Sequence, residues 1–354
     1  MNQTHTNKPY ALHIPIRTGR NMEEIFRSII MLTNAKVTGK YKYRDKFQIL
    51  PAPDHFPQVP YSEAHHPCLL EVKYNFTPDS NKKMPDQTET PDWIQRQDHE
   101  RKITHEIKTL FGVFSFSKFI DIHDNHSWTI STDDSDSIES EWRQLSYFVR
   151  EHQYEISEFT NSSVSKIDEI NTREFYNLGG RYVGSDFSIP DLFGEILDSY
   201  YSLCQNDKDA FLRSATLFNN AIKISAISAS ISFACFVSSI ESLINYINKD
   251  VKIESCTECS APRYSVTRKF REFLTKYSSN SDELIKFYNK SYGKRSKILH
   301  AGALFMGEHI PADWAESDWE AYHMSSGIQR ICRIAFTNWL MERKLFSPNL
   351  SRDI

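Results

Sequence analysis

From Pro190 onward, apolar residues recur at helical spacing almost without interruption, and this pattern restricts the chain to a fold with a large helical part. The most apolar stretch, residues 224–240, has 17 residues, of which six are serine. It is too short and too polar to span a bilayer, so it predicts a buried central helix. We expect an antiparallel bundle made of helices at residues 192–203, 209–218, 222–247, 266–277, 281–304 and 318–344. Pro190 itself is expected to open the first of them.

The first 180 residues mix strand and helix patterns. Alternation predicts strands at 10–16, 67–76 and 111–119, and apolar spacing predicts a helix at 21–32. Residues 77–100 are polar with three prolines and predict a surface loop, and the acidic run 133–141 predicts a turn that leads into a helix. The chain is therefore predicted to have an α+β N-terminal domain at 1–180, acting as a sensor or scaffold, and an all-α domain at 190–346. A linker at Gly179, Gly180 and Pro190 separates them.

Charge is distributed unevenly along the chain. The net charge is −4, but residues 263–297 contain ten Lys or Arg and three acidic residues, which makes this segment +7 and the remainder −11. Such a segment can hold a phosphate backbone, or it can be a solvated helix face. The start of the chain shows no signal peptide, and six scattered cysteines form no disulfide framework, so we expect a cytoplasmic protein with no membrane partner.

One motif in the basic segment has the residue types that RNA cleavage needs. Arg295-Ser-Lys-Ile-Leu-His300 is the only arginine followed by a histidine after four to six residues. Near neutral pH, histidine can take the proton of a ribose 2′-OH or give a proton to the departing 5′ oxygen. Arginine can stabilise the negatively charged phosphorane that forms in between. Positions five residues apart lie about 140° apart around a helix, so Arg295 and His300 of one chain barely share a face. A symmetric dimer would bring the arginine and histidine of both chains to one axis. The structural alternative is that Arg295 and His300 cap or pair within the bundle.

The order of these segments resembles the HEPN superfamily, in particular its ApeA-like branch from bacterial anti-phage defence. The resemblance covers about residues 190–345 and depends on a central helix with Glu241, a Cys-x-x-Cys connection and the Arg295–His300 motif. It implies an HEPN-like bundle, a homodimer and a metal-independent endoribonuclease of an abortive-infection system, with Arg295 and His300 catalytic and no cofactor. The alternatives are a non-catalytic HEPN interaction module within a larger defence complex, or a toxin paired with a nucleotidyltransferase. The sequence has no phosphate-binding glycine loop, paired-carboxylate nuclease motif or nucleophile elbow.

Other residues around the motif are given supporting roles. RNA contacts are predicted from the positive residues and one aromatic residue near the motif: Lys286, Lys290, Lys294, Lys297 and Tyr292. The resemblance permits Glu241 and Ser296 to support the cleft, but a glutamate on an apolar helix is otherwise a buried hydrogen-bonding residue. The aromatic residues of the last helix are expected in the core or on a dimer surface and not to form a base-stacking platform: Trp314, Trp319, Tyr322, Phe336 and Trp339.

Cys256 and Cys259 have the spacing of a zinc knuckle. They supply two of the four ligands of a structural zinc, and the others would come from a dimer mate or from His65, His66 or Cys68. The alternative is a pair of free thiols in a turn.

Overall fold

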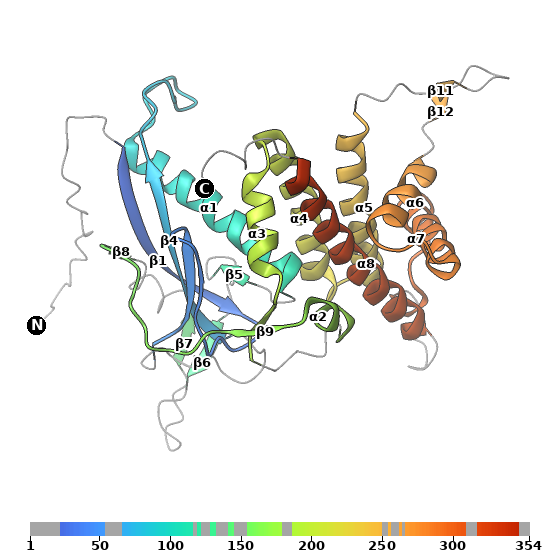
Figure 1. The fold of residues 1–354 in the computed structure, drawn as a ribbon, viewed down its shortest axis with the longest axis horizontal. Helices are drawn as coiled ribbons and strands as arrows, with labels where there is room; N and C mark the ends of the chain where they lie inside the picture. The colour runs from blue at the N-terminus through green and yellow to red at the C-terminus, as the bar shows by residue number, and fades with distance from the viewer. Residues whose placement is uncertain are drawn as a thin grey trace, which may run out of the picture.

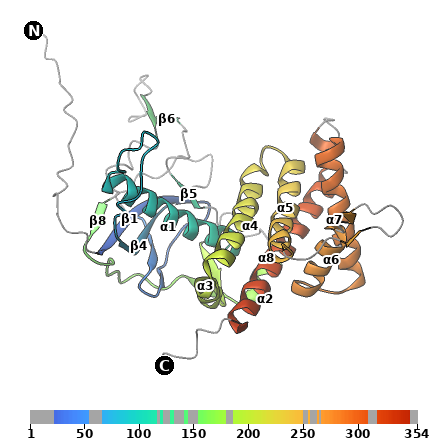
Figure 2. The same cartoon turned by 90° about the horizontal axis from the view of Figure 1, so that it is seen from above.

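An antiparallel sheet lies at one end of the molecule and the later helices lie at the other (Figures 1 and 2). The computed structural model describes residues 22–53, 66–115, 119–121, 128–131, 141–144, 154–178, 186–249, 254–255, 262–263, 266–308 and 317–346. The chain therefore has an α+β N-terminal part followed by a mostly helical C-terminal part, as the sequence predicts.

The main sheet has the order β2-β3-β4-β1-β5, and β8 pairs with β1 beside β5. Its strands are β1 Glu23–Thr33, β2 Tyr41–Tyr43, β3 Phe47–Pro51, β4 His66–Phe76, β5 Phe119–Asp121 and β8 Tyr154–Ile156. Three two-stranded pairs are formed by β6 Trp128–Ser131 with β7 Glu141–Gln144, β9 Asp168–Ile170 with β10 Ser188–Pro190, and β11 Glu254–Ser255 with β12 Pro262–Arg263. The strand predicted at 67–76 is confirmed as β4, and the one predicted at 10–16 lies outside the described residues.

The helix predicted at 21–32 is wrong, because this segment is strand β1 in the interior of the sheet. Ile29 and Met31 join the large core, whereas Ile30 and Leu32 are buried on the opposite face. A strand that is buried on both faces loses the alternation of apolar and polar residues, and its apolar run then imitates a helix.

The prediction for the segment after β4 is also partly wrong. The loop ends at Pro91, and residues 92–114 form α1, so neither a loop up to 100 nor a strand from 111 is correct. Phe111 and Phe114 are both fully buried, and their three-residue separation places them on one face of α1. The expected helix after the acidic run is wrong as well, because residues 141–144 form strand β7, while 132–140 lie outside the described residues.

The helices after α1 are α2 Thr172–Leu178, α3 Phe193–Ser202, α4 Gln205–Ile224, α5 Ala229–Ile247, α6 Val266–Tyr277, α7 Asp282–Ala301 and α8 Ser317–Phe346, with a 3-10 turn η4 at Met306–Glu308. The sequence places α6 correctly, and α3, α7 and α8 to within three residues at each end. Helix α4 is longer than predicted, because it begins four residues before and ends six residues after the expected 209–218. Two other boundaries are corrected. Pro190 ends β10 instead of opening a helix, and the segment predicted as one helix at 222–247 breaks before α5, where Ser228 caps the new helix by accepting from the N–H of Ile231.

Helix α5 is the central helix of the C-terminal part, as predicted. It contacts α4, α6, α7 and α8. Among the described residues it is the one helix long and apolar enough to cross a membrane, and 61% of its apolar window is buried inside the protein.

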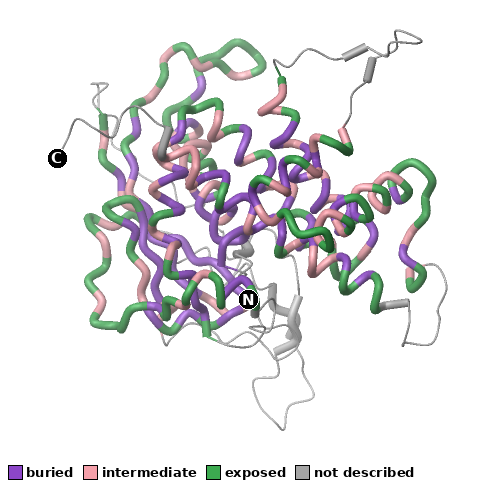
Figure 3. The backbone as a smooth tube through the Cα atoms, turned by 45° about the vertical axis from the view of Figure 1, so that its right-hand side comes forward, coloured by how far each residue is buried: buried purple, intermediate pink, exposed green. Residues whose placement is uncertain are grey.

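One continuous hydrophobic core joins the sheet to the helices (Figure 3). Helix α1 forms the junction, because its Phe111 packs against Phe47 of the sheet and its last turn meets α4 and α8. At Gly112 an added Cβ would lie 2.5 Å from Oδ1 of Asn219 on α4, so any larger residue would require the Asn219 side chain to move. Arg333 of α8 donates to the carbonyl of Val113 at 2.6 Å. The division into domains at 1–180 and 190–346 stays a prediction, with a shared core across it.

Candidate functional site

Helix α7 carries the predicted motif, and its sequence defines both of its ends. Ser281 caps the N-terminus by accepting from the N–H of Leu284, and Asp282 and Glu283 complement the helix dipole in the first turn. Gly302 ends the helix with φ +63°, a left-handed conformation that favours glycine. The motif therefore occupies the last two turns, with His300 just before this cap.

Arg295 points from α7 toward the central helix α5. Its Nη2 lies 2.6 Å from Oε2 of Glu241 and 3.5 Å from Oγ of Ser238. The hydroxyl of Tyr292 donates to Oε1 of the same glutamate at 2.9 Å, and the Tyr292 ring lies 5.9 Å from the guanidinium. Glu241 thus holds Arg295 and Tyr292 together. We call Ser238, Glu241, Tyr292 and Arg295 the Arg295 cluster.

The ion pair of the Arg295 cluster is largely buried. The side chains of Arg295 and Glu241 are 18% and 10% exposed, and Nε of Arg295 has no hydrogen-bond partner among the described residues. A pair this buried has lost most of its hydration, so each charge depends on the other. The ion pair compensates the buried charge and leaves one guanidinium donor unused.

His300 lies on a different side of α7. It is exposed, as is its neighbour Leu299, at 46%. Five residues of an α-helix rotate by about 140°, so Arg295 faces α5 while His300 faces solvent. The structure does not bring the two predicted catalytic side chains together within one chain.

Three of the four predicted lysines form a stripe beside His300. Lys286, Lys290 and Lys297 lie four and then seven residues apart, which places them on one face of α7, and all three are exposed. Lys290 pairs with Glu320 of α8 at 3.2 Å. Lys286 and Lys297 form no ion pair within the described part of the chain. Lys286 and Lys297 therefore present uncompensated positive charge to solvent.

The remaining predicted residues are placed less favourably for RNA contact. Nζ of Lys294 lies 4.4 Å from the ring centroid of Phe305 and 3.5 Å from the carbonyl of Leu304. Tyr292 is half-buried and directed to Glu241 instead of to solvent. Ser296 is half-buried.

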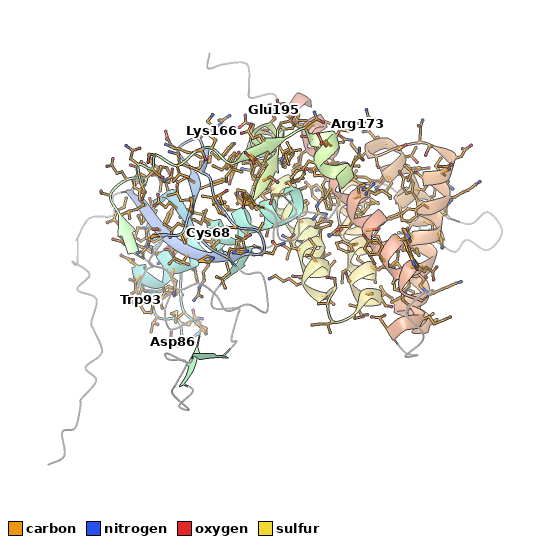
Figure 4. The ribbon with its side chains drawn as sticks, turned by 90° about the horizontal axis from the view of Figure 1, so that it is seen from below. Cys68, Asp86, Trp93, Lys166, Arg173 and Glu195 are labelled. Carbon is orange, nitrogen blue, oxygen red and sulfur yellow. The ribbon has the colours of Figure 1, made fainter. Side chains whose placement is uncertain are left out.

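The predicted zinc ligands are not assembled in the described residues. Cys256, Cys259 and His65 lie outside them. Cys68 is fully buried in β4, and burial raises the pKa of its thiol to about 12. Figure 4 shows Cys68 among the strands and not beside the later helices. Cys68 is therefore a core residue, and no group of three or more His, Cys, Asp or Glu suited to a metal occurs in the part of the chain that the structure describes.

Two features of the site were missed in the sequence. Ser238 lies one turn before Glu241 on the same face of α5, and this i, i+3 spacing is the signal that could have found it. Trp319 and Tyr322 are 59% and 66% exposed, whereas Phe336 and Trp339 of the same helix are fully buried; Trp314 lies outside the described residues. The aromatic residues of α8 therefore divide into core and surface.

Comparison of the whole chain with protein-family models, curated proteins and solved structures finds no match. The function is therefore inferred from the chain's own residues.

Removing the charge of Glu241 is expected to destabilise the fold. Glu241→Ala leaves the Arg295 guanidinium buried without a counter-charge, which should lower the free energy of unfolding by about 3–5 kcal/mol. Urea denaturation of purified protein measures the loss. Glu272→Ala, which breaks an exposed ion pair with Arg268 at 3.7 Å, is the matched control and should cost less than about 1 kcal/mol. Equal losses for the two variants would contradict the buried pair.

Tyr292 should also make stability depend on alkaline pH. Burial, with the hydrogen bond to Glu241, raises the pKa of Tyr292 to about 12 from an ordinary value of 10. Between these values the unfolded chain releases a proton that the folded chain keeps, so stability present below pH 10 is lost as the pH rises toward 12. Tyr292→Phe should therefore flatten the fall in unfolding free energy between pH 10 and 12, as measured by urea denaturation. Tyr322→Phe, at an exposed position, is the control, and an unchanged slope in Tyr292→Phe would refute the assignment.

Proposed function

We propose that the chain is a metal-independent endoribonuclease of the HEPN type, which acts as a cytoplasmic homodimer in an anti-phage or abortive-infection system. One observation carries the proposal: α7 presents an Arg-x4-His motif whose arginine is held nearly buried by Glu241 of the central helix, with an exposed lysine stripe beside the histidine. A bundle does not need such an arrangement for packing, because a buried ion pair is weak support for stability.

The roles of the two residues follow from their exposure. His300 is exposed on the last turn of α7, so an RNA backbone can reach it, and its imidazole can take the proton of the 2′-OH or give one to the departing 5′ oxygen. Arg295 supplies planar N–H donors for the more negative phosphorane.

A second copy of the chain completes this proposed site. Since Arg295 and His300 diverge by about 140° on one helix, a two-fold axis near the end of α7 would place the histidine of one copy against the arginine of the other. The exposed Leu299 beside His300 fits such an interface.

A second candidate function is a non-catalytic HEPN module that joins a partner protein in a defence complex. The observation in its favour is the Arg295–Glu241 bridge, which already compensates the charge that a phosphate would meet. A nuclease must share or open this bridge, whereas an interaction module can keep it closed.

A cleavage assay separates the two candidates. Purified protein is incubated with end-labelled RNA, and with DNA of the same sequence, with a chelator present. The nuclease should cut RNA into fragments with 2′,3′-cyclic phosphate and 5′-hydroxyl ends, and should spare DNA, which lacks the 2′-OH nucleophile. Cleavage that disappears with chelator would refute the mechanism. A stable dimer that cleaves none of a panel of cellular RNAs would favour the interaction module.

A further inference from the structure

Three exposed aromatic side chains cluster on the first turns of α8. Trp319 and His323 stack with ring centroids 4.5 Å apart and an interplanar angle of 17°, and Tyr322 meets His323 edge-on at 5.7 Å. Trp319 and Tyr322 are 59% and 66% exposed. We call these three residues the α8 aromatic face. His323 covers one side of the Trp319 ring and helps to fix its orientation.

The α8 aromatic face lies beside the lysine stripe of α7. The ion pair between Lys290 and Glu320 joins the two helices at this position, and Glu320 directly follows Trp319. Lys286 and Lys297 share the side of α7 that Lys290 presents to α8, because spacings of four and seven residues repeat on a helix. Arg330 is exposed and lies eleven residues after Trp319, which places it on the same face of α8.

Aromatic rings beside a row of cations match one class of ligand better than others. Single-stranded nucleic acid offers unpaired bases that stack on aromatic rings and phosphates that pair with lysine or arginine. The bases of a duplex are already stacked on one another and cannot use such a surface.

We propose that the α8 aromatic face and the lysine stripe of α7 together bind single-stranded RNA, with bases stacked on Trp319 and Tyr322 and phosphates at Lys286 and Lys297. This inference rests on the proposed nuclease function for the identity of the nucleic acid, and it adds a preference for single strands. It assigns Trp319 and Tyr322 of α8 a base-stacking role that the sequence did not predict, outside the core and outside the Arg295 cluster.

The test measures binding in a His300→Ala background, so that cleavage does not consume the ligand. The probe is a fluorescein-labelled 12-nucleotide oligouridine, and its affinity is followed by fluorescence anisotropy. Trp319→Leu keeps an apolar side chain but removes the π face, and it should weaken binding about fivefold to a hundredfold, as expected for one lost base stack. Trp319→Phe should retain most of the affinity. Trp93→Leu, at a 56% exposed tryptophan of α1, is the matched control.

A salt series tests the lysine stripe separately. Replacing Lys286 and Lys297 together with glutamine should reduce the slope of log affinity against log salt by about 1.4, which is 0.7 for each phosphate contact on a single strand. The same oligonucleotide annealed to its complement should bind more weakly than the single strand. An unchanged slope, or a duplex that binds as tightly, would overturn the proposal.

Two further results distinguish this inference from the proposed function. If wild-type protein cuts RNA but Trp319→Leu binds oligouridine normally, the aromatic proposal fails and the nuclease proposal stands. If Trp319→Leu loses affinity while wild-type protein cuts no RNA, the binding surface stands and the nuclease proposal fails. A Trp319→Leu variant that changes from dimer to monomer in light scattering, without loss of affinity per chain, would instead assign this face to contact between copies.

Discussion

Replacing His300 with alanine is expected to lower the rate of RNA cleavage about 10²- to 10⁴-fold, because this removes the proposed proton-transfer group. The side chain is exposed and has no contact that the fold depends on within the described residues, so the free energy of unfolding should change by less than about 0.5 kcal/mol. The measurement is single-turnover cleavage of end-labelled RNA with chelator present, together with urea denaturation of the same preparations.

Two variants make this result specific. His105→Ala removes another exposed histidine, on α1, and should cleave at the wild-type rate. Arg295→Lys keeps a positive charge next to Glu241 but loses the planar donors, so it should lose activity with a smaller change in stability than Arg295→Ala. Wild-type cleavage by His300→Ala would remove the motif from the mechanism, and a variant that fails to fold would return His300 to a structural role.

Replacing Arg333 with alanine is expected to cost about 3–5 kcal/mol of stability, which is enough to unfold a large part of the chain. Arg333 is 1% exposed, and its guanidinium lies 4.9 Å from the ring centroid of Phe218. Its Nε donates to the carbonyl of Val113 at 2.6 Å, and its Nη2 lies 3.5 Å from the carbonyl of Gly112. These carbonyls belong to the last turn of α1, where a helix has no partners of its own for them.

The charge of Arg333 persists at neutral pH despite burial. Burial lowers the pKa of Arg333 to about 9, which is still two pH units above neutrality, so the guanidinium is a cation at the negative end of the α1 dipole. Alanine would leave the carbonyls unpaired and a cavity where the side chain was. Methionine refills most of the volume and should recover part of the loss.

Urea and thermal denaturation measure this effect, with Arg330→Ala as the control one turn earlier on the exposed side of α8. The wild type should unfold in one transition, because Arg333 joins α8 to the helix that covers the sheet. Arg333→Ala should separate the transition into two. A loss below about 1 kcal/mol would show that α1 and α8 do not depend on this contact.

The sequence by itself determined most of the helical part. Helix α6 is correct at both ends, and α7 and α8 are correct within a few residues, because each has an apolar face on one side only and residues at its ends that favour capping. Strand β4 was also predictable from alternation. The sequence identified Glu241 and Arg295 as separate candidate residues. Nothing in their spacing of 54 positions indicated that they form an ion pair at 2.6 Å.

Only the tertiary structure decided the elements that are buried on more than one side. Strand β1 resembles a helix in sequence because both of its faces are covered. The end of α1 resembles a strand because its phenylalanines pack against both the sheet and the later helices. The tertiary structure also decided that Arg295 faces Glu241 while Trp319 faces solvent. Local periodicity reports how many sides of a segment are apolar, and the partner that covers each side is a property of the whole fold.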